Sequence, residues 1–481
     1  RLRGRRCGHR RRGDGIIPGV IIPSPSGRRR RALAVLGFGA LLAGCAAPQA
    51  AAPIVPAGAP AATAARVELP RPTRTVLPNG LRLIYQDHRA SDIVAVYLWV
   101  GVGVRYEKPD ELGYAHFQEH MLFKGTDQWG PGYIDRAVEG VGGRSNAVTS
   151  FDYTTFYIVV PREATETAIQ LLHDMAFRSA FDPAEIARER EVIFEEARIE
   201  TDNPRTAIVR QLYGMVFEGH PYGRPVLGVP ATMNAATRER LKAFNQHYYT
   251  PENMALVVAG PVEERAVRAM VDRTFGREPR RGYTAPPLPA PKPIVGVQRR
   301  DVERPEQQSL LAMGWAAPRS DAPDGYAIDL LASILAGTES SRLAKRLRDD
   351  ERIVSGITMS YAALVAGGIV SLRAELEAKD LARAEQIMLE EVAKIQESGP
   401  TEEERQLAVT KFESEHAFSV ETSEGLANAY GVAETTWVLE EELRYVERLR
   451  QITREQIRDA ARRYLSRENY ARLAFLPRKE R

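Results

Sequence analysis

Residues 116–120 of this 481-residue chain read His116-Phe-Gln-Glu119-His120. Residues four apart on an α-helix share a face, so both imidazoles can reach one ion while Glu119 projects beside them. Zinc accepts neutral imidazole nitrogens, and its hydrolytic sites combine three protein ligands with one open position for water. A chain of this composition is expected to contain the pattern by chance roughly 0.01 times, so a solvated face with two incidental histidines is the weaker interpretation. The stretch predicts a zinc site that needs one more protein ligand.

The third ligand is expected on a second helix, which begins near Asp182. Asp182 suits the N-cap position, and Glu185 would complete a capping box with it. Glu189 and Glu196 lie seven residues apart, which places them two turns apart on one face. A solvated acidic helix is the alternative interpretation of this segment.

Five stretches, in a fixed order, carry a likeness to a known family. They are Gly113–Thr126 (GYAHFQEHMLFKGT), Gly142–Tyr157 (GGRSNAVTSFDYTTFY), Glu189–Glu196 (EREVIFEE), His220–Gly228 (HPYGRPVLG) and Tyr249–Gly260 (YTPENMALVVAG). In order and spacing they resemble the pitrilysin (insulinase) family of inverted zincin metallopeptidases, which includes mitochondrial processing peptidase and insulin-degrading enzyme. The resemblance extends from about Pro70 to the end of the chain.

The resemblance implies a role for each residue of the two helices. His116, His120 and Glu196 correspond to the metal ligands, which hold one Zn²⁺ per chain. Glu119 corresponds to the general base that activates the metal-bound water. Glu189 corresponds to a supporting acid that orients a ligand, and a simple surface charge is the alternative for it.

Substrate contacts are implied at two further places. Asn146 and Ala147 lie where the family presents an exposed sheet edge, to which a substrate adds as an extra strand; an ordinary turn is the alternative. Family members often supply an Arg and a Tyr seven residues apart from the second half. Arg348 fits the first position, but Ser355 stands where the Tyr would be, and Tyr361 is a possible substitute contact.

This departure predicts a partner. Bacterial pairs of related chains occur in which one chain carries the metal and the other carries the Arg/Tyr pair. We therefore expect a heterodimer in which this chain is the metal-bearing bacterial subunit, with a homodimer as the alternative.

The second half repeats the order of elements of the first, which suggests duplication of a mixed α/β unit. The resemblance implies an α+β fold of two homologous α/β domains, each a mostly antiparallel sheet packed with helices, that face each other across a chamber. Six prolines between residues 277 and 295 indicate a linker between the domains. Strands are expected at 81–85, 93–101, 154–160, 255–259, 309–315 and 368–376, and helices from about 112, at 163–178, from 182, at 326–336, at 381–397 and from a capping box at 401–404.

The first segment has the parts of an export signal. Arg28–Arg31 precede the apolar run Ala32–Leu42, which is too short for a spanning helix, and Leu42-Ala43-Gly44-Cys45 resembles a bacterial lipobox. The resemblance implies lipidation of Cys45 and a location on the periplasmic side of a membrane, with the outer membrane favoured. A plain secretory signal is the alternative.

These features divide the chain into five predicted parts. They are 1–44 (upstream extension and lipoprotein signal peptide), 45–69 (lipidated Cys and flexible tether), 70–276 (N-terminal metal-binding peptidase domain), 277–295 (linker) and 296–481 (C-terminal homologous domain without the metal motif).

The charge distribution argues against nucleic acid as a partner. The net charge is +3, but residues 1–44 hold eleven Arg against one Asp, which leaves −7 for the remainder. Cys45 is the only cysteine expected after processing, so no intrachain disulfide is expected. Hydrophobic residues make up 44% of the chain and charged residues 27%, as in soluble globular proteins.

The expected function is a zinc-dependent endopeptidase acting on peptides or unfolded polypeptide segments in the cell envelope. The alternative is a non-catalytic scaffold or peptide-binding subunit of the same fold. Scaffold relatives typically lose part of the metal motif, whereas all five implicated residues are present here.

Overall fold

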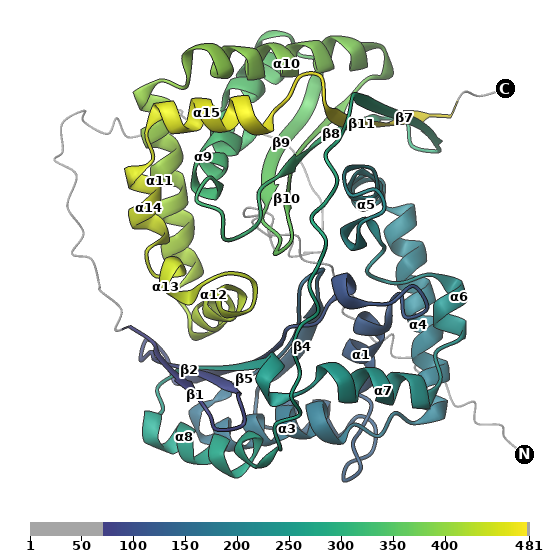
Figure 1. Ribbon diagram of the computed structural model, residues 1–481, viewed down its shortest axis with the longest axis vertical. Coiled ribbons are helices and arrows are strands. Elements are labelled where there is room, and N and C mark those ends of the chain that lie inside the picture. The colour runs from purple at the N-terminus through teal and green to yellow at the C-terminus, as the bar shows by residue number, and fades with distance from the viewer. Residues whose placement is uncertain (1–70, 479–481) are drawn as a thin grey trace, which may run out of the picture. The chain divides into compact units, whose positions relative to one another are not determined.

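The computed structural model describes residues 71–478, which form two β-sheets packed with helices (Figure 1). In spatial order the first sheet contains β1 (Thr73–Val76), β2 (Arg82–Asp87), β6 (Met254–Gly260), β3 (Ile93–Val100), β5 (Thr154–Pro161) and β4 (Arg144–Thr149). The second contains β7 (Val297–Arg304), β11 (Tyr470–Pro477), β8 (Ser309–Ala317), β10 (Gly368–Leu376) and β9 (Val354–Ala362).

The two sheets share one topology. Neighbouring strands are antiparallel except for β2 with β6 and β7 with β11, which are parallel. From β2 to β4, the first sheet therefore repeats the order of the second from β7 to β9, and β1 is an addition. The predicted α+β class with two mostly antiparallel sheets is confirmed.

Helices connect and cover these strands. In the first half they are α1 (Tyr114–Leu122), α2 (Tyr133–Gly140), α3 (Thr165–Arg178), α4 (Pro183–Asp202), α5 (Pro204–Val216), α6 (Pro230–Asn234), α7 (Arg238–Tyr248) and α8 (Glu264–Arg273). In the second they are α9 (Gly325–Ala336), α10 (Leu381–Ser398), α11 (Glu402–Ser419), α12 (Ser423–Thr436), α13 (Leu439–Glu442), α14 (Tyr445–Gln451) and α15 (Arg454–Tyr464). None of the helices in the described part of the chain combines the length and the apolar character that crossing a membrane requires.

The elements expected from the sequence are present, and their specified ends agree within two residues. The capping box of α11 is complete, because Thr401 and Glu404 exchange side-chain-to-backbone hydrogen bonds. The box expected at α4 is only half formed, which corrects that prediction. The Asp182 carboxylate accepts from the amides of Ala184 and Glu185, but the Glu185 carboxylate pairs with Arg188 instead of returning to the Asp182 backbone.

The proline-rich segment lies between the two sheets in the chain. Residues 279–295 carry neither helix nor strand, since six prolines remove backbone donors over a short span. The His220 ring holds part of this segment, because its Nε2 lies 2.9 Å from the carbonyl oxygen of Pro289.

Each sheet is covered on one face by a helix from the other half of the chain. Helix α12 packs against β3 and β6, and α5 packs against β8 and β11 (Figure 1). Helix α3 covers the opposite side of the first sheet, where it contacts β3 and β5. Strand β6 is buried along its whole length, which explains why its sequence is a continuous apolar run instead of an alternating one.

A buried polar cluster also joins the halves. Asp152 forms an ion pair with Arg105 at 3.0 Å, and both side chains are less than 10% exposed. Its carboxylate also accepts hydrogen bonds from the Tyr222 hydroxyl, at 2.6 Å, and from the backbone amide of Val365 in the second half, at 3.0 Å. Removing one partner would leave a buried charge without compensation, so the cluster fixes the junction strongly.

The contact between α12 and the first sheet requires glycine at position 431. A Cβ atom there would collide with the indole of Trp99, which is 1% exposed. We predict that Gly431→Ala lowers the free energy of unfolding by about 1–3 kcal/mol in urea denaturation, although alanine favours helix formation. Gly140→Ala in α2, where no atom lies within 4 Å of the added Cβ, should leave stability within about 1 kcal/mol. Equal stability of the two variants would contradict the assigned packing.

Candidate metal centre

Helix α1 carries the HxxEH stretch and is buried along its entire length. The Glu107 carboxylate accepts hydrogen bonds from the backbone amides of Gly113 and Ala115, at 2.9 and 2.8 Å. These bonds satisfy donors at the helix N-terminus that would otherwise lack partners. Gly113 adopts φ +90°, and a Cβ atom there would lie 2.7 Å from the Cα of Gly228. The helix is therefore fixed at its first turn, and His116 and His120 lie one turn apart.

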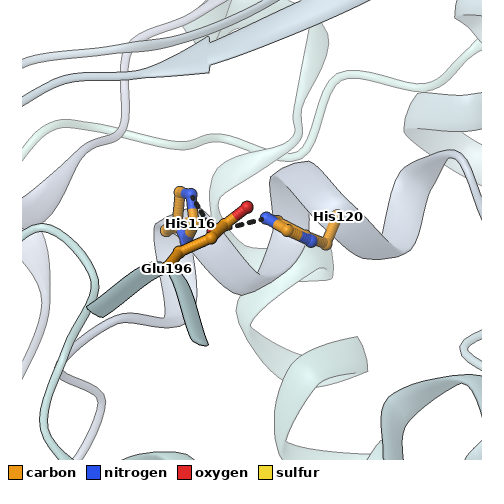
Figure 2. Close-up of side chains that lie close together, drawn as sticks. All are labelled: His116, His120 and Glu196. Carbon is orange, nitrogen blue, oxygen red and sulfur yellow. Dashed lines mark ion pairs between the residues drawn. The ribbon is translucent and has the colours of Figure 1, made fainter. Parts of the chain in front are cut away.

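Helix α4 places Glu189 and Glu196 against these histidines. Figure 2 shows the Glu196 carboxylate between the two imidazoles. Its Oε2 lies 3.4 Å from His120 Nε2 and 3.7 Å from His116 Nε2. The three side chains offer ligand atoms that all lie within 4.8 Å of one another.

The cluster fits a divalent metal ion. His120 Nε2 and Glu196 Oε2 are buried and have no hydrogen-bond partner among the described residues. Unpartnered buried polar atoms are costly, and an ion between them would satisfy both. Burial also lowers the pKa of His116, which favours the neutral imidazole that binds a metal.

Glu189 fixes the orientation of His120. Its Oε2 lies 2.9 Å from His120 Nδ1, and its Oε1 lies 2.8 Å from Lys124 Nζ. The proton of the ring is thereby held at Nδ1, which leaves Nε2 directed at Glu196. Burial lowers the pKa of His120, but the hydrogen bond with Glu189 and the nearby negative charge of Glu196 outweigh burial and raise the pKa to about 9. A metal ion bound at Nε2 would take the place of the second proton.

Glu119 lies beside the cluster and is 4% exposed. Its Oε2 is 4.0 Å from His116 Nε2 and accepts a 2.6 Å hydrogen bond from the Thr149 hydroxyl. Burial raises the pKa of Glu119 to about 7, although the hydrogen bond from Thr149 opposes this shift. A carboxyl group with this pKa can both accept and return a proton near neutral pH.

The predicted substrate edge is a strand and not a turn. Asn146 and Ala147 belong to β4, which lies at the end of its sheet and, within residues 71–478, pairs with β5 alone. The strand ends at Thr149, which contacts Glu119, so this open edge leads to the candidate metal centre.

Arg348 forms no hydrogen bond or ion pair with the described residues of the metal cluster. It lies on a short π-helix, Ala344–Asp350, where its Nε is 2.8 Å from Asp349 Oδ1 and its guanidinium also pairs with Glu339. Ser355 accepts a 2.8 Å hydrogen bond from Gln308, and the Tyr361 hydroxyl donates to the carbonyl of Pro318 at 2.8 Å. Each of the three side chains is therefore engaged locally. Cys45, the predicted lipidation site, lies outside the described residues.

Three residues that the sequence did not single out support the site. Thr149 holds Glu119, Lys124 holds Glu189, and Glu107 holds the start of α1. All three lie in or beside the quoted motif stretches, but their partners are distant in sequence or lie on another element.

Comparison with known proteins identifies the family. Residues 82–229 match the family described as Insulinase (Peptidase family M16), and residues 235–412 match its Peptidase M16 inactive domain. An uncharacterized zinc protease of Mycobacterium leprae is 33% identical over 343 residues, which cover 70% of this chain and 76% of the relative. One from Bacillus subtilis is 27% identical over 350 residues, which cover 73% and 85%. The chain belongs to the M16 (insulinase) family of peptidases, and the resemblance seen in the sequence is confirmed.

Solved structures share the fold. A protease from Helicobacter pylori aligns with a TM-score of 0.80 at 23% identity and covers 85% of this chain and 100% of its own. A putative M16-like peptidase from Alicyclobacillus acidocaldarius aligns with a TM-score of 0.75 at 21% identity and covers 86% and 100%. At these identities the likeness shows the two-sheet fold alone.

The orientation of His120 by Glu189 has a measurable consequence. We predict that Glu189→Gln weakens zinc binding about 10- to 100-fold in competition with a fluorescent chelator, because the imidazole loses its anionic hydrogen-bond partner. Glu195→Gln provides a control on the same helix, since Glu195 is exposed and pairs with Arg198. That control should bind zinc as the unaltered chain does. Equal affinities for all three proteins would show that Glu189 is only a structural acid.

Proposed function

We propose that this chain is a zinc-dependent endopeptidase that binds one Zn²⁺ through His116, His120 and Glu196. The observation that carries the proposal is the buried cluster of these three ligands beside Glu119, with unpartnered ligand atoms that converge. The names of the relatives, which are called zinc proteases, support zinc as the metal. A scaffold role would leave this complete set of side chains without a purpose.

Several residues of the chain have separate roles in the proposed amide hydrolysis. A bound zinc ion would lower the pKa of a water molecule and polarise the scissile carbonyl. Glu119 accepts the proton of the attacking water and delivers it to the leaving amine, a use that suits its pKa of about 7. Thr149 holds the Glu119 carboxylate toward the cluster, and Glu189 keeps His120 in the tautomer that binds metal.

The substrate class follows from the open edge of β4. An extended peptide can pair with β4 at Asn146 and Ala147 as an added strand, once it displaces the Asn146 Oδ1, which accepts a 2.9 Å hydrogen bond from the Ala147 amide. Such pairing requires an unfolded segment and depends little on the sequence of that segment. We therefore propose peptides and unfolded polypeptide segments as substrates, admitted between the two domains as into a chamber.

The remaining proposals concern partner and location. Because Ser355 stands where the family often has a Tyr, and because Arg348 is paired with Asp349 and Glu339, we propose that a related subunit supplies the Arg/Tyr pair in a heterodimer. A homodimer is the alternative. The lipobox-like sequence at Cys45 leads us to propose a lipid anchor on the periplasmic side of a bacterial membrane, with the outer membrane favoured.

The experiment is hydrolysis of an unstructured quenched-fluorescent peptide by the zinc-loaded chain, assayed alone and with any family-like chain that copurifies. We expect turnover that a chelator abolishes and that Glu119→Gln reduces at least about 100-fold while zinc stays bound. Glu191→Gln, an exposed change on α4, should leave the rate unaltered.

The outcomes test the peptidase activity and the need for a partner subunit separately. Turnover only in the presence of the copurifying chain supports the heterodimer, whereas full activity of the lone chain contradicts it. Absence of zinc-dependent turnover in both preparations would contradict the peptidase itself.

A further inference from the structure

A cavity lies in the half of the chain that has no metal motif. It has a volume of about 760 Å³, within the range of small-molecule sites. Helix α9, the end of β9, the end of α12 and helix α14 contribute to its wall. Helices α9, α12, α13 and α14 gather in this half, where α14 contacts α9 and α13 contacts α12 (Figure 1).

The wall of the cavity combines aromatic rings with a carboxylate. Tyr326, Tyr361, Trp437 and Tyr445 all line it and are all partly buried. Asp329 lies among them on α9, and its Oδ2 accepts a 2.8 Å hydrogen bond from the Tyr445 hydroxyl. Its other carboxylate oxygen has no hydrogen-bond partner among the described residues, so it remains available to a ligand.

The charges around the cavity favour a cation. Asp321 pairs with Arg319, and Glu441 pairs with Arg448 at 3.1 Å, so these carboxylates are neutralised locally. Asp329 forms no ion pair with any described residue; burial raises its pKa to about 7, so its carboxyl group carries the charge that attracts a cation above that pH. Helix α12 also ends at the cavity through Thr436, and the C-terminal end of a helix attracts positive charge.

We propose that this cavity binds a guanidinium or ammonium group carried on an apolar stem. Asp329 would supply a charge-assisted hydrogen bond, and the aromatic side chains would contact both the cation and its stem. Two sources share this chemistry: a basic residue of a peptide, and a free small amine. The inference concerns binding alone, so its failure and a failure of the metal-centre chemistry are distinguishable.

The test compares two probes of the same shape, one of which is charged and the other neutral. Butylguanidine and butylurea are titrated against the full chain, and the fluorescence of Trp437 is followed, with Trp437→Phe identifying its signal among the four tryptophans. We expect saturable binding of butylguanidine and at least tenfold weaker binding of butylurea. Equal affinities, or no saturable change up to about 10 mM, would overturn the proposal.

A matched pair of variants locates the charge that is responsible. Asp329→Asn should weaken butylguanidine binding at least tenfold, since the amide can still accept from Tyr445 but carries no charge. Asp459→Asn, which removes an exposed charge outside the cavity, should leave the affinity within about twofold. Unaltered affinity of Asp329→Asn would overturn the site. If that variant does not fold, the comparison of the two probes still decides.

The source of the cation is then separated with acetyl-Phe-Arg-amide and its neutral citrulline counterpart. Binding of the arginine peptide at least tenfold tighter than butylguanidine would assign the cavity to a basic peptide residue. Similar affinities would assign it to a free amine. Equal binding of the arginine and citrulline peptides would contradict a cation site.

Discussion

Two imidazoles and a carboxylate meet in the interior of this protein with ligand atoms that no other described residue satisfies. Polar atoms in such a place cost on the order of 1–3 kcal/mol each when they are left unpaired. The arrangement persists because α1 and α4 are held from outside the cluster. Glu107 caps the first helix, Asp182 caps the second, and Glu189 ties His120 to Lys124. Much of the first half can be understood as the support of these two helices.

The second half also helps to support the metal cluster, even though it has no metal motif. Strands β3 and β6 are buried on both faces only because α12 comes from the other half of the chain. The Asp152 carboxylate, which follows β4, also accepts a hydrogen bond from the Val365 amide and so holds a loop of the second half in place. Since β4 ends at Thr149 and Thr149 holds Glu119, the position of Glu119 depends on contacts that extend across both halves.

The sequence predicted the parts of this design that are local and periodic. The spacing of His116 and His120 and the two-turn spacing of Glu189 and Glu196 follow from helix geometry alone, and the structure brings these four side chains together. Thr149 and Glu107 were not foreseen, because each acts through a partner that the fold, and not the spacing, brings near. The polar strands β7 and β9 were missed because edge strands lack the continuous apolar runs of central ones. Arg348 matched a family position, yet in this chain neighbouring acids engage it, which periodicity does not reveal.

The central claim is that one zinc ion is held by two imidazoles and a carboxylate, and zinc K-edge X-ray absorption of the loaded chain tests it most directly. The account predicts a first shell of nitrogen and oxygen atoms at about 2.0–2.2 Å, no sulfur, and outer-shell scattering from two imidazole rings. His116→Ala should remove half of that imidazole scattering. A shell of oxygen atoms without imidazole scattering, or a spectrum that His116→Ala does not alter, would contradict the account.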